Sequence, residues 1–292
     1  MKDTKLLTAM ITPYTEDLEV NYAKAEEVAE YLANNGNDGI VVCGTTGESP
    51  VLSVEEKVNM YKTVKNKVGD RVKVWAGTGS NYTKGSVELT KNAEKIGVDG
   101  IMAVAPYYNK PSQEGMYRHF KAIAESTSLP IMLYNVPGRT SSNLLPETVA
   151  RLAEIDNILA IKEASGDMDQ VSAIKTKTDE KLAIYSGDDS LTLPMLAIGG
   201  VGVVSVAAHI VGNEIKSMIE AFDKGETKKA LDIHKNLFSI FKGLFITSNP
   251  VPVKESLNLM GMNAGSFRLP LIPATKEEKV YLKDLLKKYK KL

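Results

Sequence analysis

The sequence predicts an α/β fold, a closed (β/α)8 TIM barrel with a small C-terminal α-helical extension. Apolar segments followed by amphipathic helical segments recur eight times at a spacing of about 25 to 30 residues, which is typical of this fold. Residues 37–42 resemble residues 98–103, as expected when one unit is repeated. No strand pattern remains after Gly225. We therefore expect a barrel over residues 1–224 and a helical domain packed on it over residues 225–292.

The expected strands are short apolar runs, rich in β-branched residues and bounded by turn residues, as in parallel sheets covered on both faces. They span residues 6–12, 39–43, 72–76, 100–104, 130–135, 158–162, 182–186 and 201–206. Pro13 ends the first run, because proline cannot donate to a strand ladder.

The expected helices repeat apolar residues at spacings of three and four, so that one face can pack on the sheet. In the barrel they span residues 21–35, 54–68, 83–96, 113–126, 146–153, 167–178, 190–198 and 213–224, and in the extension 226–246, 253–260 and 276–288. No Pro- or Ser-rich linker separates the two parts, so we expect the extension to pack on the barrel.

A doubly wound open sheet is the alternative fold, because residues 77–82 begin like its nucleotide-binding fingerprint. This segment, Gly-Thr-Gly-Ser-Asn-Tyr, lacks the third glycine of the fingerprint, which favours the barrel.

The composition excludes several classes of protein. The 292 residues are 43% hydrophobic and 25% charged, as in ordinary soluble domains, and 36 basic residues balance 36 acidic ones. We therefore expect neither a nucleic-acid nor a membrane partner. No apolar run reaches the roughly 20 residues of a membrane span, and residues 1–4 lack the apolar core of a signal peptide. With Cys43 as the only cysteine, a cytoplasmic location is expected.

The spacing of the histidines predicts no metal site. His119, His209 and His234 lie far apart in the sequence, and none has a second candidate ligand at metal-site spacing. We therefore expect chemistry without a metal or another cofactor, and we assign no role to these residues.

In a (β/α)8 barrel, functional side chains come from the C-terminal ends of the strands and from the loops that follow. Lys162 ends the sixth expected strand. It is either a lysine that extends to solvent or an amine held in an apolar pocket, and only the second can form a Schiff base.

Hydroxyl groups follow the second and fourth strands. Thr45 and Thr46 lie between glycines and offer donors to a carboxylate, although such threonines also hold the backbone of their own turn. Tyr107 and Tyr108 lie in a loop bracketed by prolines, where a phenol can reach the site or pack at a subunit interface.

Strand five supplies a tyrosine and, just beyond it, an arginine. Tyr134 is expected at the same barrel level as Lys162, where it either relays protons or seals the rim of the core. Arg139 offers a fork to a carboxylate, and a surface ion pair is its alternative. After strand seven, Gly187 permits close approach of a ligand, and Asp188 or Asp189 caps a helix. Together these residue types describe a Schiff-base site for an α-keto acid.

Several motifs occur in one order: Gly-Thr-Thr-Gly-Glu at 44–48, Tyr-Tyr-Asn at 107–109, Tyr-Asn-Val-Pro-Gly-Arg-Thr at 134–140, Ile-Lys-Glu-Ala-Ser-Gly at 161–166 and Ser-Gly-Asp at 186–188. In this respect the chain resembles, over essentially its whole length, the dihydrodipicolinate synthase family of the pyruvate-dependent class I aldolases. The Gly-Arg-Thr segment discriminates this family from the relatives that cleave sialic acid.

The resemblance implies a lyase that condenses pyruvate with L-aspartate 4-semialdehyde to give 4-hydroxy-tetrahydrodipicolinate, the first committed step of the diaminopimelate route to lysine. Lys162 would form the imine with pyruvate, Tyr134 would act as general acid and base, and Thr45 and Tyr108 would complete a proton relay. The residue matching Tyr108 reaches in from a neighbouring subunit in this family, so a homo-oligomer, expected to be a dimer-of-dimers tetramer, is implied.

The resemblance also implies binding residues. Thr46, together with Thr45, would hold the pyruvate carboxylate, and Arg139 the semialdehyde carboxylate. Gly187 and Val204 would line the pocket of the lysine.

Lysine-inhibited members use residues that match Ser49, Asn81 and Tyr107, together with two histidines and a glutamate. Those last three positions hold Val54, Lys57 and Gly85 here, so insensitivity to lysine is our hypothesis. Two rival functions are an aldolase for a sugar-derived keto acid, which Arg139 argues against, and a non-catalytic keto-acid sensor.

Overall fold

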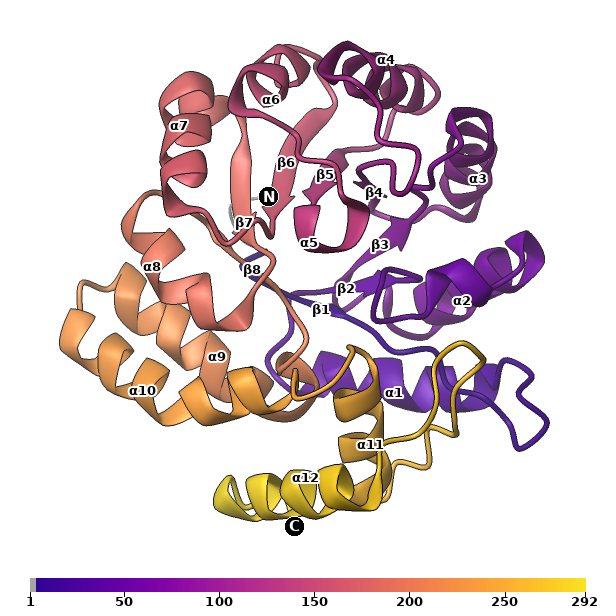
Figure 1. Ribbon diagram of the computed structural model, residues 1–292, viewed down its shortest axis with the longest axis vertical. Coiled ribbons are helices and arrows are strands. Elements are labelled where there is room, and N and C mark those ends of the chain that lie inside the picture. The colour runs from indigo at the N-terminus through magenta and orange to yellow at the C-terminus, as the bar shows by residue number, and fades with distance from the viewer. Residues whose placement is uncertain (1–3) are drawn as a thin grey trace.

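A computed structural model describes residues 4–292 and shows a closed barrel of parallel strands, ordered β1 to β8 around the barrel (Figure 1). The strands are β1 Leu6–Ala9, β2 Gly39–Val42, β3 Lys73–Gly77, β4 Gly100–Val104, β5 Ile131–Asn135, β6 Ile158–Glu163, β7 Ala183–Ser186 and β8 Gly202–Ser205. The predicted (β/α)8 fold is confirmed. Residues 1–3, part of the segment expected to lack a signal peptide, lie outside the described residues.

Helices surround the barrel (Figure 1). They are α1 Tyr22–Asn34, α2 Val54–Val68, α3 Thr83–Ile96, α4 Gln113–Ala124, α6 Pro146–Leu152, α7 Met168–Thr178, α8 Thr192–Ala197 and α9 Ala208–Asp223. Local sequence sets several starts: Asn21 caps α1, Asp167 caps α7, and Ser53 with Glu56 forms a reciprocal capping box on α2.

Some expected boundaries were wrong. β1 ends at Ala9 rather than at residue 12, because the groups that follow leave the ladder: the Ile11 amide donates to His209 Nε2, and the Thr12 hydroxyl donates to the Gly47 carbonyl. The helix expected at 190–198 is divided into a 3₁₀ turn, Asp189–Leu191, followed by α8. α9 begins before residue 213, with non-helical dihedrals at Val211.

The short helix α5 Pro137–Thr140 was not expected. It follows β5 directly and lies near the centre of the view in Figure 1. Proline at its first position suits a helix start, because the missing amide hydrogen has no acceptor there. α5 carries Arg139 and therefore places it beside the end of the barrel.

The barrel interior forms a packed cluster of its own, separate from the larger core between sheet and helices. Its buried members are Leu7, Ala9, Val41, Trp75, Met102, Met132, Tyr134, Val136, Ala160, Tyr185 and Val204. These side chains fill the barrel interior, as is typical of this fold. The functional side chains at the end of the barrel therefore pack on a filled core.

The chain ends in helices α10 Thr227–Gly243, α11 Val251–Leu259 and α12 Lys276–Lys288. α10 packs along α9, and α11 contacts both α9 and α12. Figure 1 shows α10 outside α9 and α12 at the lower edge of the view. A separate domain beginning at residue 225 stays a prediction. Within residues 4–292, no helix combines the length and the apolar character needed to cross a membrane.

Candidate active site

Lys162 and Tyr134 face each other at the C-terminal end of the barrel. β5 and β6 pair in a register that sets Tyr134 beside Lys162, as predicted from the sequence. The Lys162 Nζ lies 4.2 Å from the centroid of the Tyr134 ring, and the two residues are only 4% and 5% exposed. Lys162 is therefore a buried amine above an apolar floor and does not extend to solvent.

Glu163, which sequence reasoning missed, anchors the strand end that carries Lys162. It is buried, and its carboxylate accepts hydrogen bonds from the Asn135 side chain at 3.0 Å, from Gln170 Nε2 at 3.2 Å and from the Ser165 amide at 2.7 Å. Because neighbouring strand residues point to opposite faces, Glu163 faces the helices while Lys162 faces the barrel.

Residues 44–48, which we call the threonine turn, follow β2. The Gly44 carbonyl accepts from the amides of Gly47 and Ser49. Cys43, just before the turn, and Glu48, its last residue, both adopt positive φ angles of 55°. Non-glycine residues rarely occupy this region, so surrounding contacts must hold the turn in its shape.

The two threonines of the turn point to different places. Thr45 is half-buried and lines a cavity at the end of the barrel. Thr46 is buried, and its hydroxyl accepts a hydrogen bond from Asn249 Nδ2 at 3.0 Å, in the C-terminal extension.

The cavity measures about 270 Å³. Thr45, Tyr107, Tyr134, Arg139 and Lys57 are among its lining residues. It therefore brings three of the expected site residues to one space, with hydroxyl and cationic groups that suit carboxylate substrates.

Arg139 is exposed on α5, and its Nη2 donates to the Asn249 carbonyl at 3.4 Å. Across residues 4–292 no carboxylate lies within ion-pair distance of Arg139, so the alternative of a surface ion pair within the chain is not realised. The guanidinium is available to an anionic ligand in the cavity.

Tyr108 does not line the cavity of its own chain. Its side chain is 88% exposed and its φ angle is 73°. The structure thus separates Tyr108 from Thr45 and Tyr134 within one chain.

Gly187 follows β7, and Val204 lies on β8, which pairs with β1. A Cβ on Gly187 would come within 2.5 Å of the Ala164 Cβ, so only glycine fits against the segment after β6. Val204 belongs to the same interior cluster as Tyr134.

Two aspartates after β7 differ in role. Asp188 caps the 3₁₀ turn, as one of the pair was expected to do. Asp189 is buried and accepts hydrogen bonds from the Ser205 hydroxyl and from the amides of Val206 and Ala207, which joins the loops after β7 and β8. Burial raises the pKa of its carboxyl.

Cys43 is buried at the cavity wall, and burial raises the pKa of its thiol to about 12. It is thus a protonated core thiol at neutral pH.

Of the residues singled out for lysine inhibition, Ser49, Lys57 and Tyr107 line the cavity, whereas Val54 is 59% exposed. Burial lowers the pKa of Lys57. Among the described residues no cluster of three or more His, Cys, Asp or Glu side chains is placed to hold a metal ion.

A closed (β/α)8 barrel with a buried lysine against a tyrosine at its catalytic end defines a class, that of the Schiff-base-forming barrel aldolases. The comparisons with known proteins identify the family. Residues 2–289 match the model of the Dihydrodipicolinate synthetase family, and the chain belongs to that family. The family predicted from the sequence is confirmed.

The relatives match nearly the whole chain. A 4-hydroxy-tetrahydrodipicolinate synthase of Desulforudis audaxviator (strain MP104C) is 57% identical over 283 residues, 97% of this chain and 96% of the relative. A dihydrodipicolinate synthase structure from Bacillus anthracis is 53% identical, with a TM-score of 0.95, and covers 98% of this chain and 99% of that one. One from Cyanidioschyzon merolae with lysine bound is 45% identical, with a TM-score of 0.98, and covers 100% and 99%.

Proposed function

We propose that the protein is a lyase that condenses pyruvate with L-aspartate 4-semialdehyde to give 4-hydroxy-tetrahydrodipicolinate, the first committed step of the diaminopimelate route to lysine. The observation that carries this proposal is the buried Lys162 amine, in register with Tyr134, at the catalytic end of a barrel of this family. Enzymes that carry this activity in their names are 57% and 58% identical to the chain.

Lys162 is the nucleophile. Its amine attacks the ketone carbon of pyruvate, and loss of water gives an imine. The protonated imine nitrogen draws electrons from the neighbouring carbon, so the methyl group can lose a proton and become an enamine. The enamine adds to the aldehyde carbon, and the amine of the second substrate then displaces Lys162 as the ring closes.

Tyr134 transfers protons during these steps, because its ring lies against the Lys162 amine. Thr45, which lines the same cavity, and Tyr108 extend the relay toward solvent. Tyr108 acts in the cavity of a neighbouring subunit, which is supported by its 88% exposure and its absence from its own cavity. The active form is accordingly a homo-oligomer, a tetramer built from two dimers.

The remaining site residues bind the substrate carboxylates and shape the pocket around Lys162. The turn of Thr45 and Thr46 holds the pyruvate carboxylate, and Arg139 holds the carboxylate of the semialdehyde. Gly187 and Val204 leave room beside Lys162. The catalytic barrel spans residues 1–224, the helical domain spans residues 225–292, and the enzyme acts in the cytoplasm.

The enzyme is insensitive to lysine. The relative from Cyanidioschyzon merolae has lysine bound, but here the cavity presents the Lys57 amine, and position 85 is a glycine that offers no carboxylate. A second ammonium group would be repelled by Lys57, and glycine at position 85 supplies no carboxylate to offset this repulsion.

The test is turnover of pyruvate plus L-aspartate 4-semialdehyde, coupled to the pathway reductase and followed by nicotinamide oxidation. We expect a rate that is lost in Lys162→Ala and in Arg139→Ala. A rate absent from the wild type, with pyruvate still trapped on Lys162 by borohydride, would keep the imine chemistry but reject the second substrate.

A further inference from the structure

The C-terminal extension holds the threonine turn and its surroundings through three polar side chains, although they lie about 200 residues away in the sequence. Asn249 donates to the Thr46 hydroxyl, and Lys254 forms an ion pair with Glu48 at 2.9 Å. Arg268 contacts the segment just beyond, where its Nη1 donates to the Val51 carbonyl at 3.0 Å.

The ion pair between Glu48 and Lys254 is entirely buried. The two side chains are 1% and 0% exposed, and the Lys254 Nζ also lies 4.1 Å and 5.0 Å from the ring centroids of Tyr14 and Phe267. Desolvation lowers the pKa of Lys254 to about 8 and raises that of Glu48, so each charge depends on the other. Removal of one partner therefore leaves the other buried and unpaired.

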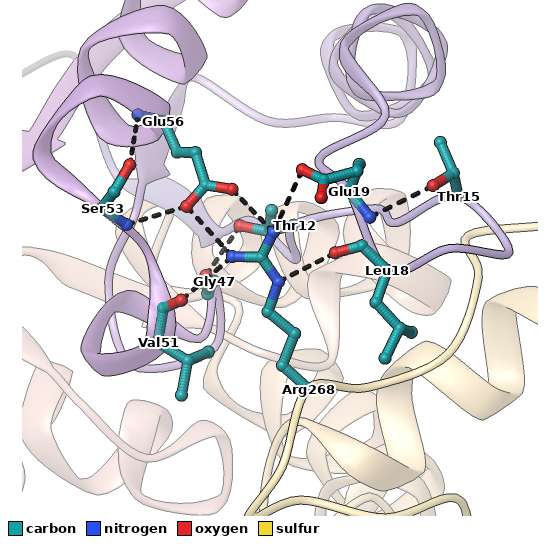
Figure 2. A network of polar contacts seen from close by, with 9 residues as sticks. All are labelled: Thr12, Thr15, Leu18, Glu19, Gly47, Val51, Ser53, Glu56 and Arg268. Carbon is teal, nitrogen blue, oxygen red and sulfur yellow. Dashed lines mark hydrogen bonds and ion pairs between the residues drawn. The ribbon is translucent and has the colours of Figure 1, made fainter.

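Arg268 fixes the far end of this region, as Figure 2 shows. Its guanidinium binds both carboxylate oxygens of Glu56, at 3.0 Å and 2.6 Å, and Nε donates to the Leu18 carbonyl. Glu56 also accepts from the Ser53 amide in the capping box of α2. Thr12 supports the turn from a third direction through the Gly47 carbonyl (Figure 2).

Glu48 connects the threonine turn to the contacts made by the C-terminal extension. Its amide donates to the Thr45 carbonyl, and its own carbonyl accepts from the Val51 amide, so its left-handed backbone closes the turn on one side and starts the next. A non-glycine residue in this conformation is held by its surroundings. Lys254 is the one residue that forms an ion pair with the Glu48 side chain among the described residues, and Arg268 adds a weaker attraction.

We infer that Glu48 and Lys254 are positioning residues, whose buried ion pair fixes the threonine turn in the shape that binds the pyruvate carboxylate. The inference rests on the proposed function. Neither Glu48 nor Lys254 is among the residues that line the cavity, so both act through Thr45 and Thr46. Loss of the pair weakens pyruvate binding, whereas the chemistry on Lys162 proceeds once the site is saturated.

The experiment measures the pyruvate concentration that half-saturates borohydride trapping on Lys162, in the full-length protein. In Lys254→Met we expect this concentration to rise about tenfold or more, with the same maximal trapping. Lys279→Met is the matched control, because Lys279 forms an ion pair with Glu255 of the same extension, its side chain is 43% exposed, and among the described residues it makes no ion pair with residues 44–48. The half-saturating pyruvate concentration of Lys279→Met should equal that of the wild type.

Glu48→Gln covers the case in which Lys254→Met does not fold, since glutamine keeps the shape and an oxygen that accepts from Lys254. For Glu48→Gln we expect a smaller increase in the half-saturating pyruvate concentration. Lys254→Arg retains the charge, so its half-saturating concentration should lie between those of the wild type and Lys254→Met. A folded Lys254→Met or Glu48→Gln variant with wild-type half-saturation overturns the inference. If the wild type itself traps no pyruvate, the proposed function fails. This outcome differs from failure of the inference alone, in which the wild type and the folded variants trap pyruvate equally well.

Discussion

Because His209 is buried, we predict that the folded protein loses a defined amount of stability in acid. This fully buried imidazole joins the two ends of the barrel sequence: its Nε2 accepts from the Ile11 amide at 3.2 Å, and its Nδ1 lies 2.9 Å from the Val206 carbonyl. These partners require a neutral ring with the proton on Nδ1. Protonation of Nε2 would remove the acceptor for Ile11, and burial lowers the pKa of His209 to about 4.

The sign and size of the effect follow from linkage. Because the pKa is lower in the folded state than in the unfolded state, the unfolded chain binds more protons below about pH 6.5, and the folded state loses stability as pH falls. With pKa values of about 4 folded and about 6.5 unfolded, the loss from this one group amounts to about 2 kcal/mol between pH 7.5 and pH 5, and it is complete only below about pH 4.

His209→Gln isolates this contribution. Glutamine cannot titrate, and its side-chain oxygen can accept from the Ile11 amide in place of Nε2. We expect urea unfolding of the wild type to lose about 2 kcal/mol more than the variant between pH 7.5 and pH 5. Equal losses in the two proteins would refute the reasoning, because they would show that His209 does not titrate between these states.

Three further results are expected. Tyr134→Phe should lower kcat by about 10²- to 10⁴-fold in the coupled assay, because the hydroxyl is lost while the ring that lies against Lys162 remains; a rate near that of the wild type would remove Tyr134 from the proton relay. Gly187→Ala should lower the free energy of unfolding by about 1–3 kcal/mol in urea, since the added Cβ meets the Ala164 Cβ at 2.5 Å; an unchanged midpoint would show that the two segments separate freely. Added L-lysine should leave turnover unchanged, because the Lys57 amine lines the cavity, and half-maximal inhibition at submillimolar lysine would contradict this.

Much of the fold follows from local patterns. Each strand-helix unit satisfies its own hydrophobic period, and consecutive parallel strands pair with their neighbours, so the adjacency of Tyr134 and Lys162 could be predicted. The left-handed conformation of Glu48 and the short helix α5 could not, because both depend on contacts that no local period records.

The supporting residues of the site were missed for a related reason. Asn249, Lys254 and Arg268 reach the loop after β2 from a helical extension whose docking direction is set by tertiary packing. In the sequence, nothing local distinguishes these three residues from ordinary polar residues. A lysine among the apolar residues at the start of α11 was the available signal, since a buried lysine requires a partner of opposite charge.

Trapping with borohydride tests the central claim most directly. The protein is reduced in the presence of pyruvate, digested, and the modified peptide is sequenced by mass spectrometry. The proposed mechanism predicts a single reduced pyruvate adduct on Lys162, which is absent from Lys162→Ala. A label on another lysine, or an undiminished label in that variant, would contradict the assignment of Lys162 as the nucleophile.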